Sequence, residues 1–156
     1  MNDRGALLDL PIAKSRDSAI LCVDDEPEVL SALGRMLRSE PYEVLRARSG
    51  SEAIDLLGRV PVKVIVTDER MPEMSGSELL AEVRAKWPLV GRIILTGYPG
   101  PTLMIRSLQA GGDILMSKPW NAERLKLMIR QLIDGVDRSR PEGMEEPWYD
   151  MGGEGG

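Results

Sequence analysis

The run from Val62 to Thr67 constrains the fold of this chain more than any other stretch. Five of its six residues are β-branched, and Lys63 is the one charged residue among them. A short apolar run of this kind, closed by turn-forming residues, is typical of a strand buried on both faces of a parallel sheet. The run ends at Asp68, and open parallel sheets bind ligands at the carboxyl ends of their strands. Asp68 is therefore either a reactive carboxylate or an ordinary turn former and helix cap.

Apolar runs and helical patterns alternate along the whole chain. The expected strands cover 19–23, 42–47, 62–67, 92–95 and 114–116, and the expected helices cover 27–38, 49–58, 77–87, 101–110 and 121–135. Strands that alternate with helices indicate βαβ units and a parallel sheet covered on both faces. Right-handed crossovers then favour a flavodoxin-like α/β fold, a doubly wound five-stranded parallel sheet in the order 2-1-3-4-5 with five flanking helices.

The length of 156 residues fits one domain with two appendages. We expect an N-terminal extension over 1–17, a folded domain over 18–135, and a flexible tail rich in Gly, Glu and Pro over 136–156. The longest uncharged run, from Ile93 to Ile105, has 13 residues with two Gly and two Pro, too short and broken to span a bilayer. The N-terminus lacks the apolar core of a signal peptide, which favours a cytoplasmic protein.

The absence of histidine narrows the possible chemistry. It excludes Ser-His-Asp and Cys-His catalytic sites and any His-bearing zinc site, and the single Cys22 cannot form a thiolate cluster. Cys22 lies in an apolar run, where we expect a buried small hydrophobe in a reducing compartment. The net charge of −5 argues against nonspecific nucleic-acid binding. Carboxylates, hydroxyls, Lys and Arg remain, and their oxygen ligands suit Mg²⁺ or Ca²⁺.

Polar residues follow four of the expected strands at the edge where ligands bind. Asp24 and Asp25 follow the first strand, Asp68 the third, Thr96 the fourth and Lys118 the fifth. Each alone is typical of a cap or a surface charge. Three carboxylates close together repel, however, and a hard divalent cation with an ammonium group relieves that repulsion. A hydroxyl and an ammonium facing a metal-bound carboxylate suit the oxygens of a phosphoryl group. Because the chain has no P-loop, we expect this group to arrive on a donor and to move to Asp68 as an acyl phosphate.

Four motifs on these residues resemble the receiver domain of bacterial two-component response regulators. The motifs are V-D-D-E-P, T-D-x-R-M-P-x-M-S-G, L-T-G-Y and S-K-P-W, in the family's order and over about residues 18–135. The T-G-Y and K-P-W endings are similar to receivers joined to cyclic-diguanylate phosphodiesterase or transcriptional output domains. The resemblance implies that Asp68 accepts a phosphoryl group from a histidine kinase or phosphotransfer protein. Such a protein is a phosphoacceptor that assists its own phosphorylation and dephosphorylation, rather than an enzyme.

The resemblance also implies which groups hold Mg²⁺. Asp25 and Asp68 would bind the ion directly, together with the backbone carbonyl of Arg70, while Asp24 would act mainly through water. The same Arg70 weakens a rival interpretation, an aspartate-nucleophile phosphatase. Such an enzyme normally has a second Asp two residues after the nucleophile as its acid and base, and Arg70 stands at that position.

Two further residues would handle the phosphoryl group, and one usual element of the family is missing. Thr96 would ligate the group and Lys118 would pair with it. The resemblance also implies that the Lys118–Pro119 bond is cis, which would direct the Lys118 side chain into the site. The family usually has Tyr or Phe three residues before this Lys, as a rotameric switch; this chain has Leu115 there, and Tyr98 is the nearest aromatic substitute. The departure keeps open a second alternative, an interaction module that does not depend on phosphorylation.

A signal would have to leave this chain through its surface. About twenty residues follow the last expected helix, which is too short for an output domain. The fourth helix, fifth strand and fifth helix carry more apolar residues than one buried stripe needs: Leu103, Met104, Ile105, Leu108, Leu125, Leu127, Met128 and Ile129. Leu127 lies off the core stripe of its helix, so we expect it to be exposed. A downstream protein, a second copy of the chain, or the chain's own ends would cover this face.

Overall fold

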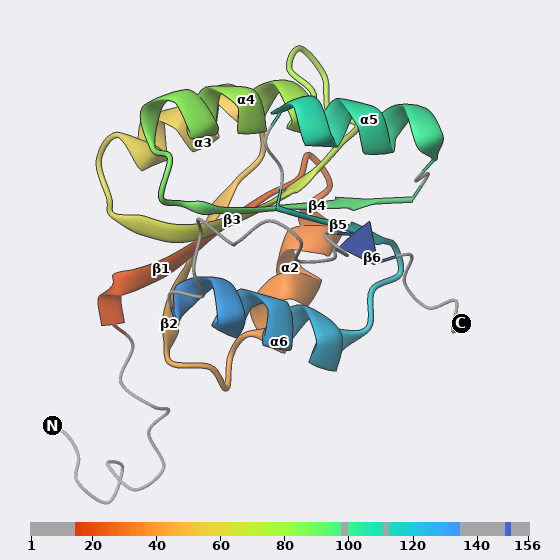
Figure 1. The fold of residues 1–156 in the computed structure, drawn as a ribbon. Coiled ribbons are helices and arrows are strands. Elements are labelled where there is room, and N and C mark those ends of the chain that lie inside the picture. The colour runs from red at the N-terminus through yellow and green to blue at the C-terminus, as the bar shows by residue number, and fades with distance from the viewer. Residues whose placement is uncertain (1–14, 98–99, 111–112, 135–148, 151–156) are drawn as a thin grey trace, which may run out of the picture.

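Five parallel strands form the centre of the molecule, in the predicted order β2-β1-β3-β4-β5 (Figure 1). The structure is a computed structural model and describes residues 15–97, 100–110, 113–134 and 149–150. The strands are β1 (Ser15–Val23), β2 (Tyr42–Ala47), β3 (Val62–Asp68), β4 (Gly91–Thr96), β5 (Ile114–Ser117) and β6 (Tyr149–Asp150). The helices are α2 (Pro27–Met36), α3 (Gly50–Leu57), α4 (Gly76–Lys86), α5 (Pro101–Ala110) and α6 (Ala122–Ile133). The fourth and fifth helices expected from the sequence are thus α5 and α6.

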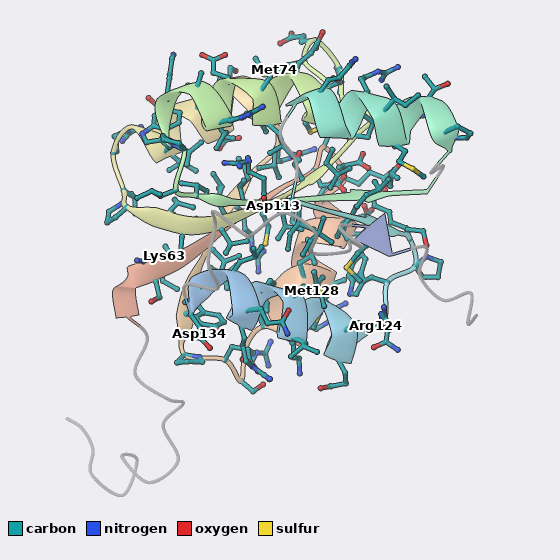
Figure 2. The ribbon with its side chains drawn as sticks, viewed as in Figure 1. Lys63, Met74, Asp113, Arg124, Met128 and Asp134 are labelled. Atoms are coloured by element: carbon teal, nitrogen blue, oxygen red, sulfur yellow. The ribbon has the colours of Figure 1, made fainter. Side chains whose placement is uncertain are left out.

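Two helical layers enclose the sheet. Figure 1 shows α3, α4 and α5 on one face and α2 with α6 on the other. Alternate residues of β3 serve the two layers, because Ile65 packs in the cluster with α4 whereas Val64 and Val66 pack in the cluster with α6. Side chains fill the space on both sides of the sheet, as Figure 2 shows. The strand predicted from the β-branched run is therefore buried on both faces, as expected.

Cys22 belongs to the core layer between the sheet and helices α2 and α6. Its thiol is fully buried and unpaired with another cysteine. Burial raises the pKa of Cys22 to about 12, so the thiol stays protonated at neutral pH. Cys22 is a small buried hydrophobe, which confirms the prediction.

The first strand begins earlier than the sequence indicated. Ser15 pairs with Tyr42 of β2, and the register shifts between Ser15 and Ala19. The extension predicted over 1–17 therefore contains the start of β1, and residues 1–14 lie outside the described residues. The polar sequence S-R-D-S carries no apolar alternation, so main-chain pairing alone reveals this part of the strand.

Part of the predicted flexible tail forms a sixth strand. Tyr149–Asp150 pairs in parallel with β5, opposite Leu115 and Met116. The outer edge of β5 offers unpaired backbone groups, and two residues can pair with it without any apolar pattern in the sequence. The rest of 136–156 lies outside the described residues. In the described part of the chain, no helix is long and apolar enough to cross a membrane.

The helix after β3 begins with two devices that fix its start. Ser75 and Glu78 form a capping box, in which each side chain accepts a hydrogen bond from the other's backbone N–H. Gly76 packs against the end of β3, where a Cβ atom would lie 2.2 Å from the carbonyl oxygen of Asp68. The N-terminus of α4 is therefore held directly against the residue that the sequence analysis singled out.

Candidate functional site

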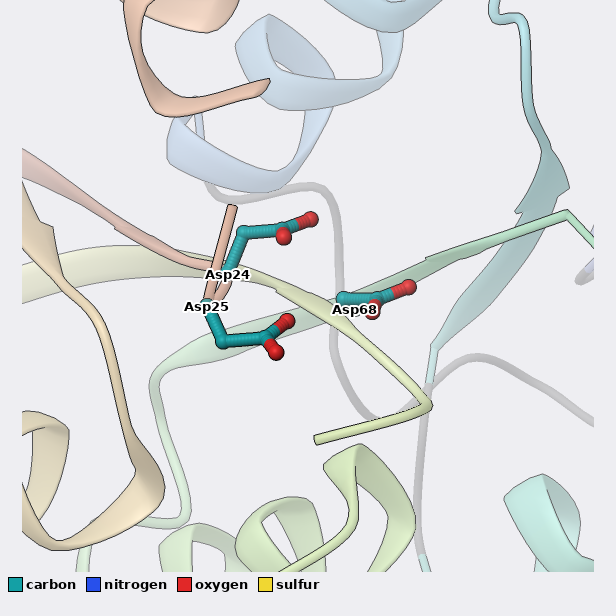
Figure 3. Close-up of side chains that lie close together, drawn as sticks. All are labelled: Asp24, Asp25 and Asp68. Atoms are coloured by element: carbon teal, nitrogen blue, oxygen red, sulfur yellow. The ribbon is translucent and has the colours of Figure 1, made fainter. Parts of the chain in front are cut away.

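Three carboxylates meet at the carboxyl end of the sheet. One oxygen from each of Asp24, Asp25 and Asp68 lies within 4.8 Å of the others, and these three residues are called the acidic cluster below. Figure 3 shows two of them at the end of β1 and the third at the end of β3. Asp24 and Asp68 are buried and Asp25 is half-buried. The expected meeting of these side chains follows from the strand order, because β1 and β3 are neighbours.

Asp24 is held in place by hydrogen bonds to three parts of the chain. Its backbone N–H donates to the carbonyl of Ala47 at the end of β2, at 3.1 Å. Its Oδ1 accepts from the backbone N–H of Glu26 at 2.9 Å, and its Oδ2 accepts from Lys118 Nζ at 3.0 Å. A carboxylate held in this way is a fixed member of the site rather than a solvated turn residue.

Lys118 places an ammonium group on the acidic cluster. Its Nζ lies 3.0 Å from Asp24 Oδ2 and 3.1 Å from Asp68 Oδ1. Burial acts to lower the pKa of Lys118, but hydrogen bonds and charge from these two carboxylates outweigh burial and raise that pKa above its usual value. The Lys118–Pro119 bond is cis, as expected. The lysine is charged at neutral pH and faces the site, so it is not a surface charge.

Thr96 reaches the same edge through the sheet register. It pairs with Ser117, and its carbonyl accepts a hydrogen bond from the backbone N–H of Lys118 at 2.7 Å. The neighbouring register places Asp68 opposite Leu95. Thr96 is buried, so the structure brings this hydroxyl residue to the strand end beside both Asp68 and Lys118.

Asp68 sits in a setting that disfavours its negative charge. Burial raises the pKa of Asp68, Lys118 acts to lower it, and the charge of Asp24 raises it further, so that the net direction is upward. The three carboxylates of the cluster carry more negative charge than the Lys118 ammonium group offsets. An added cation would reverse that imbalance, and oxygen ligands suit Mg²⁺.

The remaining predicted residues have different outcomes. Arg70 lies in the loop after β3 with its side chain exposed, two residues beyond Asp68. Leu115, at the position of the family's aromatic switch, is 1% exposed in the core layer below α4 and α5. The proposed substitute, Tyr98, lies outside the described residues.

Sequence reasoning missed a buried acidic residue beside the cluster. Glu69 is 6% exposed, although it follows β3 in a loop and glutamate is usually a surface residue. Its Oε1 accepts hydrogen bonds from the N–H and the hydroxyl of Ser77, both at 2.8 Å. Its Oε2 accepts from Arg106 Nη1 of α5 at 2.9 Å. Its partners are 8 and 37 residues away in sequence, so no local pattern announces the contact.

Comparison with known proteins agrees with this geometry. Residues 20–130 match the model of the response regulator receiver domain. The hydrogenase transcriptional regulatory protein HoxA of Cupriavidus necator is 39% identical over 120 residues, which are 76% of this chain and 25% of HoxA. The chain thus spans about a quarter of the length of that relative.

Two solved structures resemble the fold closely. The signal receiver domain of an HD domain-containing protein from Pseudomonas fluorescens Pf-5 is 31% identical, with a TM-score of 0.73 over 75% of this chain and 94% of that one. A CheY-like response regulator receiver domain protein from Methanospirillum hungatei JF-1 is 29% identical, with a TM-score of 0.73 over 79% of this chain and 98% of that one.

Proposed function

The chain belongs to the response regulator receiver domain family, and on that premise we propose that it accepts a phosphoryl group on Asp68. A histidine kinase or a phosphotransfer protein would be the donor. The observation that carries the proposal is the acidic cluster, with Lys118 Nζ 3.1 Å from Asp68 Oδ1. Receiver domains are phosphoacceptors rather than conventional enzymes, and they generally bind Mg²⁺ at an acidic pocket of this kind.

The chain's own groups fit a hard cation. We assign direct Mg²⁺ ligation to Asp25, Asp68 and the backbone carbonyl of Arg70, and a contact through water to Asp24. All are oxygen donors, and the carboxylates carry more negative charge than Lys118 compensates. When bound, Mg²⁺ supplies positive charge that offsets the charge on the phosphoryl oxygens.

Asp68 acts as the nucleophile in this scheme. A carboxylate oxygen forms the bond to phosphorus, and the bond from phosphorus to the donor breaks, with its electron pair staying on the donor. Asp68 must be ionised to attack. Because burial raises its pKa, the opposing effect of Lys118 on that pKa favours the reactive form.

Thr96 and Lys118 receive the transferred group. The Lys118 ammonium already lies within hydrogen-bond distance of the acceptor carboxylate, so oxygens attached there would be within its reach. Thr96 ends the adjacent strand and would donate its hydroxyl to a second phosphoryl oxygen. The Lys118 ammonium is in place before the reaction, and donors positioned in advance are the usual source of electrostatic stabilisation.

We place the output on the face formed by α5, β5 and α6. Ile105 on α5 is 57% exposed and Leu127 on α6 is 44% exposed, whereas Leu125 and Ile129 are fully buried. The expected exposure of Leu127 is thus confirmed, and β6 occupies part of the β5 edge between the two helices. A downstream protein or a second copy of the chain would bind here. The net charge of −5 disfavours nucleic acid and anionic membranes.

Intact-mass measurement after incubation with acetyl phosphate and Mg²⁺ tests the proposal. We expect a gain of about 80 Da, for one phosphoryl group, in the wild type and no gain in Asp68→Asn. Asp55→Asn is the matched control, because Asp55 is an exposed aspartate of α3 that pairs with Arg59 in the turn after that helix. An undiminished gain in Asp68→Asn would place the acceptor elsewhere, and a gain that survives chelation of Mg²⁺ would remove the metal from the reaction.

A further inference from the structure

Glu69 joins the loop beside the acidic cluster to two helices at once. Its carboxylate uses one oxygen on α4, where Ser77 donates two hydrogen bonds of 2.8 Å, and the other on α5, where Arg106 donates at 2.9 Å. The side chain of Glu69 is 8% exposed and that of Arg106 is 53% exposed. A charge pair with one buried partner resists solvent screening better than a pair between two exposed side chains.

The backbone of Glu69 connects the start of α4 to the acidic cluster. Its carbonyl accepts a hydrogen bond from the N–H of Gly76 at 3.0 Å, which ties it to the start of α4. Its two neighbours in sequence are Asp68 and Arg70, to which the proposed function assigns metal ligation. A displacement of the backbone at those two residues would also displace Glu69, which lies between them.

The described core contacts of α5 and β5 are apolar. The family's aromatic switch position holds Leu115, a buried aliphatic residue that packs in the core and cannot form a side-chain hydrogen bond. Leu103 anchors α5 through an apolar contact, which has little directional preference. The ion pair to Glu69, in contrast, has a fixed donor and acceptor and reports any displacement of the loop.

We propose that Glu69 and Arg106 couple occupation of the acidic cluster to the position of helix α5. The inference rests on the proposed function, because it takes Asp68 and Arg70 as the groups that respond to the ligand. Occupation of the cluster changes the Glu69–Arg106 pair, and α5 changes with it. Both residues are positioning residues, since neither touches the reacting atoms. By linkage, the factor by which Mg²⁺ changes the equilibrium between the formed and the broken Glu69–Arg106 pair equals the factor by which forming the pair changes the Mg²⁺ affinity.

Hydrogen exchange measured by mass spectrometry on the full chain tests this coupling. The amides of α5 are compared in the free protein, with Mg²⁺, and with Mg²⁺ plus acetyl phosphate. The variants are Arg106→Gln, which removes the charge at similar length, Glu69→Gln, and Arg106→Lys as the conservative rescue. Arg59→Gln is the matched control, because it also removes a surface arginine from an ion pair, in the turn after α3.

We expect ligand to change α5 exchange in the wild type, in Arg59→Gln and, in part, in Arg106→Lys. In Arg106→Gln and Glu69→Gln this ligand-dependent difference should disappear, and the Mg²⁺ dissociation constant of Arg106→Gln should shift about five-fold or more. If the pair were purely structural, its removal would raise α5 exchange equally with and without ligand, and the ligand-dependent difference would remain as in the wild type.

Two results would overturn the coupling. One is a wild-type α5 whose exchange does not respond to Mg²⁺ or acetyl phosphate, and the other is an Arg106→Gln variant that responds as the wild type does. Intact mass on the same samples separates this failure from that of the proposed function. If phosphorylation is normal but α5 exchange does not respond to ligand, only the role of Glu69 and Arg106 is wrong. If the mass gain is absent, Asp68 is not the acceptor, and the response of α5 exchange to Mg²⁺ alone decides the coupling.

Discussion

The two ends of the parallel sheet hold their charges in opposite ways. At the carboxyl end, the acidic cluster has three carboxylates, and among the described contacts Lys118 is the lysine that pairs with them, through Asp24 and Asp68. At the amino end, acids and bases face one another in pairs. Arg92 lies near the start of β4 with its Nη2 3.8 Å from Asp113 Oδ1, and Arg130 Nε donates to Glu40 Oε1 at 3.2 Å. Figure 2 labels Asp113 at the level of the sheet.

This difference separates structural charges from ligand-binding charges. A buried carboxylate opposite an arginine is already compensated, so it has no need of a further cation. A group of carboxylates with too little positive charge favours an added cation, and at Asp68 burial, which raises its pKa, adds to the cost of the negative charge. Charge imbalance, rather than the presence of charge, marks the end of the sheet that binds a ligand.

Among the charged residues at the two ends of the sheet, Arg92 should cost the most stability when it is removed. Arg92 is 8% exposed, and its Nη1 donates to the carbonyls of Pro88 at 3.2 Å and Val90 at 3.0 Å. Arg92→Ala leaves these groups and Asp113 without the guanidinium, so we expect a loss of about 3 kcal/mol, or roughly 6–12 °C in Tm. Thermal denaturation measures the loss.

The comparison itself is tested by the Mg²⁺ affinity of the same Arg92→Ala protein. Because Arg92 lies at the opposite end of the sheet, its loss should leave that affinity unchanged in a titration below the melting range. The exposed Arg59→Ala is the control and should change stability by less than about 0.5 kcal/mol. A lower Mg²⁺ affinity in Arg92→Ala would mean that the two ends are not independent.

Removing a carboxylate from the unbalanced end should reverse this pattern. Asp25 is half-buried in the turn after β1 and belongs to neither core layer, so Asp25→Ala should change the folding stability little. As a direct ligand is lost, the Mg²⁺ affinity should fall at least about tenfold. The fluorescence of Trp120, two residues from Lys118, provides the titration signal. Equal responses to Mg²⁺ in wild type and Asp25→Ala would place the metal away from this cluster.

Neutralising Asp68 should stabilise the metal-free fold. Because the pKa of Asp68 is raised, the folded state binds its proton more tightly than the unfolded chain does. Ionisation of Asp68 therefore costs stability as the pH rises through that raised pKa, and below the unfolded pKa of about 4 the cost is absent. Asp68→Asn should raise Tm by roughly 2–4 °C at pH 7 and by less at pH 4. A gain that is equal at both pH values would contradict a charge origin.

The smallest effect on stability is expected at the output face. Leu127→Glu places a charge on a side chain that is 44% exposed, so the free energy of unfolding should change by less than about 0.5 kcal/mol. Leu125→Ala, at a fully buried position of the same helix, should cost about 2–5 kcal/mol and is the control. Light scattering then shows whether Leu127→Glu weakens self-association, and a large loss of Tm would instead place Leu127 in the core.

The apolar signals of the sequence predicted the strand order and the position of the acidic cluster well. Each central strand has its own β-branched or alternating run, and parallel order brings the ends of such strands together. The start of β1 and the pairing of β6 could not be read in this way, because main-chain hydrogen bonds connect them to β2 and β5. The burial of Glu69 was equally hidden, since it depends on Arg106 from a distant helix.

The contact between Gly76 and Asp68 limits how this site can vary during evolution. A methyl group at Gly76 would meet the carbonyl oxygen of Asp68 at 2.2 Å, and a backbone atom cannot give way as a flexible side chain can. At Gly97 and Gly100, by comparison, an added Cβ meets nothing within 4 Å. A library that randomises all three positions should therefore retain glycine at Gly76 and accept small side chains at the other two. The position of the acceptor carboxylate therefore depends on a glycine, a residue without a side chain, at the start of the next helix.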